Sequence, residues 1–247
     1  MPSLAIFARL LSQQQEQEAC SQSIGKEKRR NIQFTLSDYN AAVLHLVTLP
    51  NFLLTWYRHV IKSQNTSSTA ITEGKTTSGT QQSENNEDDY ELDITPELVE
   101  NFLQDLSYRG VTIDFISGAW SLGFVDLALS SSSSSRDNGI QSQTNTKTLI
   151  LASETIYSPL SLGAFSETLL GLLRGSTSAS RGGCRALIAA KKVYFGVGGG
   201  VDEFLSVLKD ISNDYDGLVV RWKRNDETGG VGRLILEVVE SKSLNKT

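Results

Sequence analysis

Apolar residues follow two different spacings along this chain, and the alternation between them predicts a mixed α/β fold. Short continuous apolar runs, typical of buried strands, occupy residues 32–36, 111–116, 148–152 and 186–194. Apolar residues spaced three or four apart, as on one face of a helix, occupy residues 4–11, 43–54, 98–106, 162–172 and 204–211. Two further apolar segments flank "NDETGG" and predict an antiparallel hairpin over residues 217–224 and 232–239.

The order of these elements indicates how they pack. Strands that alternate with helices form parallel sheets with helices on both faces. We therefore predict an α/β fold with a mostly parallel sheet, closed by the C-terminal antiparallel hairpin, in a single domain over residues 1–247. The carboxyl ends of parallel strands form the ligand crevice of such sheets. Polar or glycine-rich residues follow each predicted strand, and these residues are the candidates for a functional site.

Several polar tracts interrupt the pattern. Residues 62–90, 130–147 and 175–183 contain too few apolar side chains to join a core, and we expect disordered insertions there. The basic run "KEKRR" at residues 26–30 is expected to be a solvated loop. A net charge of -5 argues against a nucleic-acid-binding surface.

Cysteine and histidine usage narrows the chemistry further. Two cysteines, Cys20 and Cys184, provide neither a disulfide framework nor a zinc-binding spacing, so we expect a reducing, intracellular compartment and no metal. His45 and His59 lie 14 positions apart on one helical segment and are expected to have surface or packing roles. No apolar run reaches membrane-spanning length, and we expect no membrane association.

The first two strand ends carry a carboxylate and an indole. Asp38 follows the strand at residues 32–36, where a carboxylate can accept two hydrogen bonds from a ribose or can cap the next helix. Gly118, Ala119 and Trp120 follow the second strand. Small residues there let a flat ring approach the backbone, and the indole is either a pocket wall or an ordinary core residue.

The other two strand ends carry a glutamate and a glycine-rich loop. Glu154 and Tyr157 follow the third strand, where a glutamate requires either a function or a salt bridge or hydrogen bond that anchors the loop. The sequence "YFGVGGG", Tyr194 to Gly200, lacks the lysine and serine or threonine of a P-loop. It predicts a tight turn with close backbone packing, which lines a pocket.

These strand ends stand within longer stretches that resemble one family. The stretches "SDYNAAVLHLVTLPNFLL", "ITPELVENFLQDLSYRG", "ISGAWS", "LILASETIYSP" and "KKVYFGVGGGVDEF" are similar to the histidine protein methyltransferases of fungi and animals. These are class I methyltransferases with a Rossmann-like sheet. "SETIY" followed by "YFGVGGG" is specific to this family. The resemblance implies a protein-histidine N-methyltransferase that uses S-adenosyl-L-methionine as its cofactor.

The resemblance also implies roles for individual residues. Asp38, Tyr39 and Asn40 would bind the cofactor's ribose, while Gly118, Ala119 and Trp120 would flank its adenine. Ser153 and Glu154 would approach the methionine portion, with Glu154 as the candidate catalytic residue that orients the substrate imidazole. The residues that would shape the substrate slot are Tyr157, Tyr194, Gly196 and Gly198. The family implies a histidine of a large-subunit ribosomal protein as the substrate, a cytoplasmic or nuclear location, and a monomer without direct nucleic-acid contact.

One departure from the family pattern concerns the start of the chain. The family has a strand and a glycine-rich turn before a helix that resembles "PSLAIFARLL", whereas this sequence opens at Met1-Pro2-Ser3-Leu4. We therefore expect an N-terminally truncated methyltransferase domain without the central first strand and its loop. This departure leaves one alternative open, a non-catalytic fragment or interaction protein that keeps part of the fold. A second alternative is a doubly wound nucleotide-dependent enzyme, and the terminal hairpin and the missing phosphate loop count against it.

Overall fold

The structure is a computed structural model that describes residues 2–20, 31–61, 92–131, 146–179, 183–192, 194, 196, 198–212, 218–226 and 232–240. The residues cluster into two compact units, unit 1 with Met1–Phe34 and Ala42–Ile113, and unit 2 with Thr35–Ala41 and Asp114–Thr247. The polar tract at 62–90, most of the tract at 130–147 and the basic run at 26–30 lie outside the described residues. The single domain predicted from the sequence stays a prediction.

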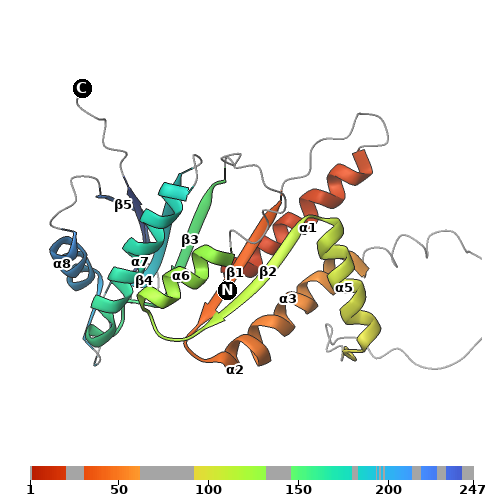
Figure 1. Ribbon diagram of the computed structural model, residues 1–247, viewed down its shortest axis with the longest axis horizontal. Coiled ribbons are helices and arrows are strands. Elements are labelled where there is room, and N and C mark those ends of the chain that lie inside the picture. Colours follow the sequence, from red (N-terminus) through yellow and green to blue (C-terminus); the bar gives the residue numbers. More distant parts are fainter. Residues whose placement is uncertain are drawn as a thin grey trace, which may run out of the picture. The chain divides into compact units, whose positions relative to one another are not determined.

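Helices and strands alternate along the described chain, as the apolar spacing predicts (Figure 1). The helices are α1 (Pro2–Cys20), α2 (Ala41–Val43), η1 (Leu44–Thr48), α3 (Leu49–Trp56), η2 (Tyr57–Ile61), α5 (Pro96–Tyr108), α6 (Leu122–Ser131), α7 (Pro159–Ala179) and α8 (Val201–Ile211). The strands are β1 (Ile32–Asp38), β2 (Val111–Ser117), β3 (Thr148–Ser153), β4 (Cys184–Lys191), β5 (Leu218–Asp226) and β6 (Arg233–Glu240).

In unit 1, α1 extends well beyond the apolar residues 4–11 that predict it. The side chains of Phe7 and Leu11 are fully buried, as expected for the apolar face. Gln14 then donates a hydrogen bond to the Arg109 carbonyl at 3.3 Å, and Gln15 donates one to the His59 carbonyl at 2.7 Å. These tertiary contacts stabilise a polar second half of the helix, which apolar spacing alone does not reveal.

The helical segment from residue 41 to residue 61 passes through Pro50 without ending. Its two wider π-helical turns, η1 and η2, flank α3, and Pro50 is the second residue of α3. A proline lacks the backbone N–H of a regular helix, and wider turns are a common way to accommodate this. Pro50 is therefore accommodated by a local change of helical pitch and does not break the helix.

Helix α5 begins and ends at residues that are typical of helix ends. The Thr95 hydroxyl accepts a hydrogen bond from the Leu98 N–H at 3.2 Å, Pro96 is the first helical residue, and Gly110 follows the helix with φ 67°. On its inner face, Asp105 Oδ2 accepts hydrogen bonds from Trp56 Nε1 and Arg109 Nε, each at 2.7 Å. This carboxylate links α5 to α3 and neutralises the buried Arg109 side chain.

The described strands form two sheets. In the first, β1 pairs with β2, and hydrogen bonds join Ile32 to Gly110 at one end and Gly118 to Asp38 at the other, so the two strands are parallel. The second sheet has the order β3-β4-β6-β5, with β3 parallel to β4 and the hairpin strands antiparallel. The hairpin is confirmed, while the truncated first strand stays a prediction. Parallel and antiparallel pairings together are compatible with a methyltransferase fold.

One face of the four-stranded sheet carries the core of unit 2. Alternate residues of β4 and β6, such as Ile188 and Leu236, are fully buried against α7 and α8. Helix α6, which apolar spacing did not predict, packs against α7 where Gly171 and Gly175 leave room for the side chains of Val125 and Leu129. Helix α7 runs through residues 175–179 of the expected polar insertion, because this packing covers its last turns.

The opposite face of this sheet buries a charged residue. The Glu237 side chain is only 4% exposed and lies 2.8 Å from Lys223 Nζ, 3.5 Å from Arg185 and 3.7 Å from Arg221. A hydrogen bond with Lys223, together with the three positive charges, holds the pKa of Glu237 below its ordinary value of 4.5, against the opposing effect of burial. One carboxylate thus interacts with three positively charged side chains from β4 and β5.

This arrangement predicts acid-sensitive stability. Because the pKa of Glu237 is lower in the folded state, this residue contributes to the free energy of unfolding. The contribution is fully present above the unfolded pKa of about 4.5 and is lost as the pH falls through the folded pKa. We expect wild type to have a higher melting temperature than Glu237→Gln at pH 7, with the difference shrinking below pH ~4.5. Melting curves of both proteins between pH 3 and pH 7 test this, and a difference that does not change with pH contradicts it.

Candidate functional site

The carboxyl ends of the parallel strands β3 and β4 bring two of the predicted motifs together. Glu154 directly follows β3, and its N–H donates a hydrogen bond to the Ala189 carbonyl of β4 at 3.0 Å. Its φ of 56° lies in the left-handed region, where it is the one residue other than glycine among those described. Such a backbone conformation is unfavourable for a residue with a side chain and is often found at functional positions. The side chain itself is exposed.

The glycine-rich loop after β4 packs directly on this segment. A Cβ atom on Gly199 would lie 2.6 Å from the Tyr157 carbonyl oxygen, and Gly199 has φ 78°. One on Gly198, which has φ 75°, would lie 3.2 Å from the Pro159 ring. The loop is therefore a turn with close backbone packing, as the sequence predicts. Gly196 also has positive φ, but a Cβ there would meet open space.

Two tyrosines accompany this contact. The rings of Tyr157 and Tyr194 lie 6.3 Å apart with an interplanar angle of 58°, and Tyr157 is 48% exposed. The Tyr194 hydroxyl accepts a hydrogen bond from the Lys191 N–H at 3.1 Å, and Lys191 Nζ lies 5.7 Å from the centre of the Tyr194 ring. Burial, with a smaller contribution from the nearby Glu154 carboxylate, raises the pKa of Tyr194 to about 12, against the lowering effect of the Lys191 N–H.

A pocket of about 400 Å³ lies beside these strand ends. Ser153 and Glu154 line it together with Arg233, which begins β6 next to the end of β4. The other lining residues come from β4 and β6 and are Ala189, Ala190, Leu234 and Ile235. The pocket combines a carboxylate and a guanidinium above an apolar floor, so it can accept a polar ligand that carries both charges.

A second group of predicted residues lies at the ends of β1 and β2. The Gly118 N–H donates a hydrogen bond to the Asp38 carbonyl at 3.2 Å, which places the two strand ends side by side. Asp38 Oδ1 accepts the Asn40 N–H at 2.8 Å just before α2 begins, which forms a local turn and does not cap the N–H groups of the helix itself. No hydrogen bond to its second carboxylate oxygen is found among the described residues. Gly118 has φ 140°, and a Cβ there would meet nothing within 4 Å.

Trp120 connects this group to the core of unit 2. Its ring makes edge-to-face contacts with Phe124 at 5.2 Å and Phe165 at 5.7 Å, and Phe165 contacts Phe204 of α8. The indole is partly buried and packs against the core of unit 2, and its role as a pocket wall stays a prediction. Ala119 and Tyr39 are both exposed, with 79% of Tyr39 accessible. These exposed side chains leave the ends of β1 and β2 accessible to solvent.

Sequence reasoning missed two members of the site. Lys191 contacts Tyr194, and Arg233 lines the pocket. Neither residue has an obvious function of its own in the sequence. The "KK" before "VYFGVGGG" is the only sequence signal for Lys191, and Arg233 reaches the site because β6 is antiparallel to β4. The pairing of β4 with β6 thus reveals that Arg233 lies at the site.

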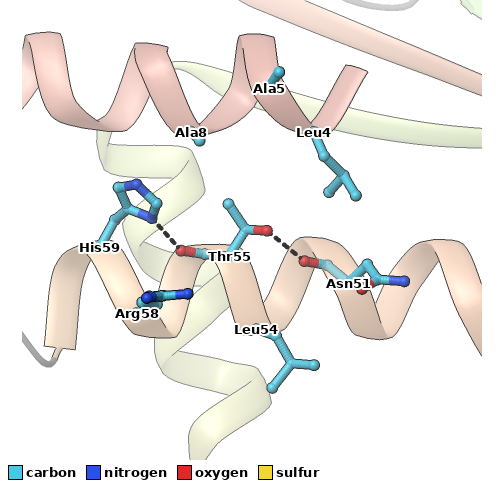
Figure 2. Close-up of a pocket in the computed structure, with 8 residues that line it drawn as sticks. All are labelled: Leu4, Ala5, Ala8, Asn51, Leu54, Thr55, Arg58 and His59. Carbon is cyan, nitrogen blue, oxygen red and sulfur yellow. Dashed lines mark hydrogen bonds between the residues drawn. The ribbon is translucent and has the colours of Figure 1, made fainter. Parts of the chain in front are cut away.

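Unit 1 has a separate pocket of about 350 Å³ that does not resemble a catalytic site (Figure 2). It lies between α1 and the α3–η2 segment and is lined by Leu4, Ala5, Ala8, Asn51, Leu54, Thr55, Arg58 and His59. His59 Nδ1 lies 2.8 Å from the Thr55 carbonyl of its own helix, so its ring is held by a local contact. Among the described residues there is no cluster of potential metal ligands, and no described helix is long and apolar enough to cross a membrane.

A mixed α/β protein with polar and glycine-rich residues at the ends of parallel strands is compatible with a methyltransferase fold. No known family model matches the chain. Histidine protein methyltransferase 1 of Saccharomyces cerevisiae is 31% identical over 218 residues, which cover 88% of this chain and 52% of the yeast protein. The Schizosaccharomyces pombe protein of the same name is 32% identical over 81% of this chain and 46% of its own length. A rat homologue is 50% identical over 62 residues, 25% of this chain and 15% of the rat protein.

The chain belongs to the histidine protein methyltransferase family. It spans about half the length of the yeast relatives it matches.

Proposed function

We propose that this chain forms part of an S-adenosylmethionine-dependent enzyme that methylates a histidine side chain of a protein substrate. The contact between Gly199 and the Tyr157 backbone carries this proposal, because it joins the two motifs by which the sequence resembles the family. Beside that contact lie an exposed carboxylate, two aromatic rings and a pocket. The names of the yeast relatives support the same activity.

The two strand-end groups fit the two halves of this cofactor. Asp38 keeps one carboxylate oxygen for the ribose hydroxyls, and the open space at Gly118 admits the adenine ring beside the backbone. Ser153 and Glu154 line a pocket that suits the charged methionine end, with Arg233 opposite in charge to Glu154. Four further residues flank Asp38 and Gly118 and are proposed to contact the cofactor as well: Tyr39, Asn40, Ala119 and Trp120.

The proposed reaction needs little acid–base chemistry from the protein. The cofactor supplies a methyl group that is already activated by the sulfonium charge. Tyr157 and Tyr194 form aromatic walls for an imidazole ring, and such walls also exclude water. The Glu154 carboxylate orients that ring and stabilises the positive charge that develops on it. Alignment of the ring nitrogen with the methyl group then provides most of the rate enhancement.

The proposal extends to the substrate, the cellular location and the oligomeric state. The family resemblance implies a histidine of a large-subunit ribosomal protein as the acceptor, and we propose this substrate together with a cytoplasmic or nuclear location and a monomeric enzyme. The exposed Tyr157 side chain would contact the substrate directly, while the Gly196 and Gly198 loop would border the slot. Methylation of a histidine within an assembled or nascent ribosomal protein would require such an open site.

Methyl transfer from labelled S-adenosylmethionine tests the proposed function. Purified protein is incubated with large ribosomal subunits from cells that lack the gene, and the hydrolysed product is analysed for methylhistidine. We expect label in one ribosomal protein, with Glu154→Gln strongly impaired. Cofactor binding without transfer to any protein would favour a non-catalytic role. Transfer to a residue other than histidine would contradict the proposed chemistry.

The ribose contact gives a specific prediction for cofactor affinity. Asp38→Ala removes the acceptor for two ribose hydroxyls, and each lost hydrogen bond costs roughly 0.5–1.5 kcal/mol, more if a hydroxyl is left buried and unpaired. We expect the dissociation constant of S-adenosylmethionine to rise about tenfold or more, as measured by calorimetric titration. Asp126→Ala, which removes an exposed carboxylate of α6, is the matched control and should bind normally. Unchanged affinity in a folded Asp38→Ala protein would refute the ribose assignment.

A further inference from the structure

The two faces of the four-stranded sheet differ in what covers them. Side chains alternate between the faces of a strand, and the buried core of unit 2 takes every second residue, such as Ile188 of β4 and Leu236 of β6. The residues between them point to the other side. There the strand registers place one row across all four strands, which consists of Leu151, Leu187, Glu237 and Arg221. We call the side of the sheet that carries this row the Glu237 face.

Apolar side chains on the Glu237 face are incompletely covered. Leu149 is 47% exposed, and Leu151 and Leu187 are partly buried. Within the described part of unit 2, Leu151 and Leu187 are not among the side chains that pack with the core beneath α7 and α8. Parallel strands are normally buried on both faces, and exposed apolar surface with a polar rim marks an interaction site. This face can therefore bury further apolar surface against a partner.

Positive charge surrounds these apolar side chains. Arg185 and Arg221 are 63% and 60% exposed, and they share the single Glu237 carboxylate with Lys223. Lys223 makes the short contact at 2.8 Å, whereas the two guanidinium groups lie at 3.5 and 3.7 Å. A guanidinium has five N–H donors, which one shared carboxylate does not satisfy. Three positive charges against one negative leave the Glu237 face locally positive, although the whole chain has a net charge of -5.

The Glu237 face continues into the candidate site. The next row along the strands consists of Ser153, Ala189 and Ile235, and all three line the pocket at the ends of β3 and β4. Arg233, one row further along β6, adds another exposed positive charge to the lining of that pocket. A chain segment that lies on this face therefore reaches the pocket directly.

The chemistry of the Glu237 face favours a protein segment over two other occupants. In a two-fold contact between copies of this chain the same patch faces itself, so a locally positive patch would meet like charge. Single-stranded nucleic acid binds to surfaces that stack its bases on aromatic rings. The exposed ring of β5, Trp222, pairs with Leu236 and so lies on the other face. Apolar side chains with arginines beside them instead fit an acidic, amphipathic segment.

We propose that the Glu237 face is the docking surface for the methyl-accepting protein, and that its occupant is an amphipathic segment whose apolar residues are flanked by aspartates or glutamates. This inference rests on the proposed function, which places the acceptor at the neighbouring pocket. The apolar residues of the segment cover Leu149 and Leu187, and its carboxylates bind Arg185 and Arg221. Docking on this face guides the acceptor histidine toward the pocket.

Two synthetic helical peptides test the chemistry of this surface without methyl transfer. They share one apolar stripe and differ only in the residues beside it, glutamates in one and lysines in the other. We expect wild type to bind the glutamate peptide at least about tenfold more tightly, as measured by fluorescence anisotropy. The double variant Arg185→Gln/Arg221→Gln, which keeps the contact between Lys223 and Glu237, should lose most of this preference. A wild type without the preference, or a double variant that keeps it in full, would overturn the proposal.

Two further variants separate apolar docking from general attraction to anions. Leu149→Gln should weaken binding of the glutamate peptide about threefold, because it removes an apolar contact. Lys209→Gln removes an exposed positive charge of α8 and is the matched control, which should bind as wild type does. Single-stranded oligouridine is the competing probe. Tighter binding of this RNA than of the glutamate peptide, unaffected by Leu149→Gln, would overturn the choice of a protein segment.

Kinetics with large ribosomal subunits test whether the occupant is the methyl acceptor. We expect Arg185→Gln/Arg221→Gln to raise the KM for the subunits about fivefold while kcat changes less than about twofold, and Lys209→Gln to change neither. An unchanged KM in the double variant would overturn the acceptor as the occupant. A wild type that shows the peptide preference but transfers no methyl group would refute the proposed function, and the docking surface for an acidic segment would stand.

Discussion

Gly199→Ala should destabilise unit 2 by about 3 kcal/mol and abolish activity at the candidate site. The new Cβ would lie 2.6 Å from the Tyr157 carbonyl oxygen, 2.8 Å from its carbonyl carbon and 3.1 Å from the Ile156 oxygen. All three neighbours are backbone atoms, so no side-chain rotation relieves the clash. The φ of 78° adds the cost of a left-handed conformation, about 1–2 kcal/mol for alanine. Urea unfolding followed by fluorescence measures the loss.

Gly196→Ala is the matched control within the same loop. Gly196 has the same φ of 78°, but a Cβ there would meet nothing within 4 Å. This variant therefore has the backbone strain without the clash, and we expect a loss of about 1 kcal/mol. The difference between the two variants measures how closely the glycine-rich loop packs on the segment after β3. Equal losses at the two glycines would contradict that close packing.

Asp105→Ala should destabilise unit 1 by about 3–5 kcal/mol, the usual cost of removing one partner of a buried ion pair. The substitution removes the acceptor of the Trp56 and Arg109 hydrogen bonds, both at 2.7 Å. The Arg109 side chain is only 4% exposed, so its charge is left without a counterion inside the protein. Because Trp56 belongs to α3 and Arg109 follows α5, both helices lose their shared contact. Thermal and urea unfolding of the variant measure this loss.

The same helix offers a control for the loss of a carboxylate as such. Glu100 is exposed and accepts a hydrogen bond from Gln104 at 3.1 Å. Glu100→Ala should therefore change the unfolding free energy by no more than about 0.5 kcal/mol. A loss below about 1 kcal/mol for Asp105→Ala would show that the Arg109 guanidinium finds another partner or reaches water, and would contradict its dependence on the Asp105 carboxylate.

Local sequence signals predicted most of the elements that position the site. The Thr95-Pro96 start and the Gly110 end of α5 are properties of a few adjacent residues, and the structure confirms them. The hairpin of β5 and β6 and the strands β1 to β4 follow in the same way from apolar spacing. The turn at residues 198–200 was also predictable, since consecutive glycines favour positive φ.

Other elements depend on partners that are distant in the sequence. The polar half of α1 is stabilised by Gln14 and Gln15, which bind the carbonyls of Arg109 and His59. Helix α6 has few helical signals of its own and packs into the space left by Gly171 and Gly175. Glu237 lies within an apolar strand pattern, and its three cationic partners come from other strands. None of these contacts has a local signature.

The sequence by itself determined the family, the order of strands and helices, and the strand ends that carry the candidate residues, because each depends on short motifs or on periodicity. The tertiary structure decided what those residues do to one another. It placed Gly199 against the Tyr157 backbone, gave Glu154 a left-handed backbone conformation and brought the rings of Tyr157 and Tyr194 to 6.3 Å from each other. The physical reason is that these contacts join the ends of β3 and β4, whose paired residues, such as Thr148 and Cys184, are distant in the sequence, through parallel pairing that no local pattern specifies.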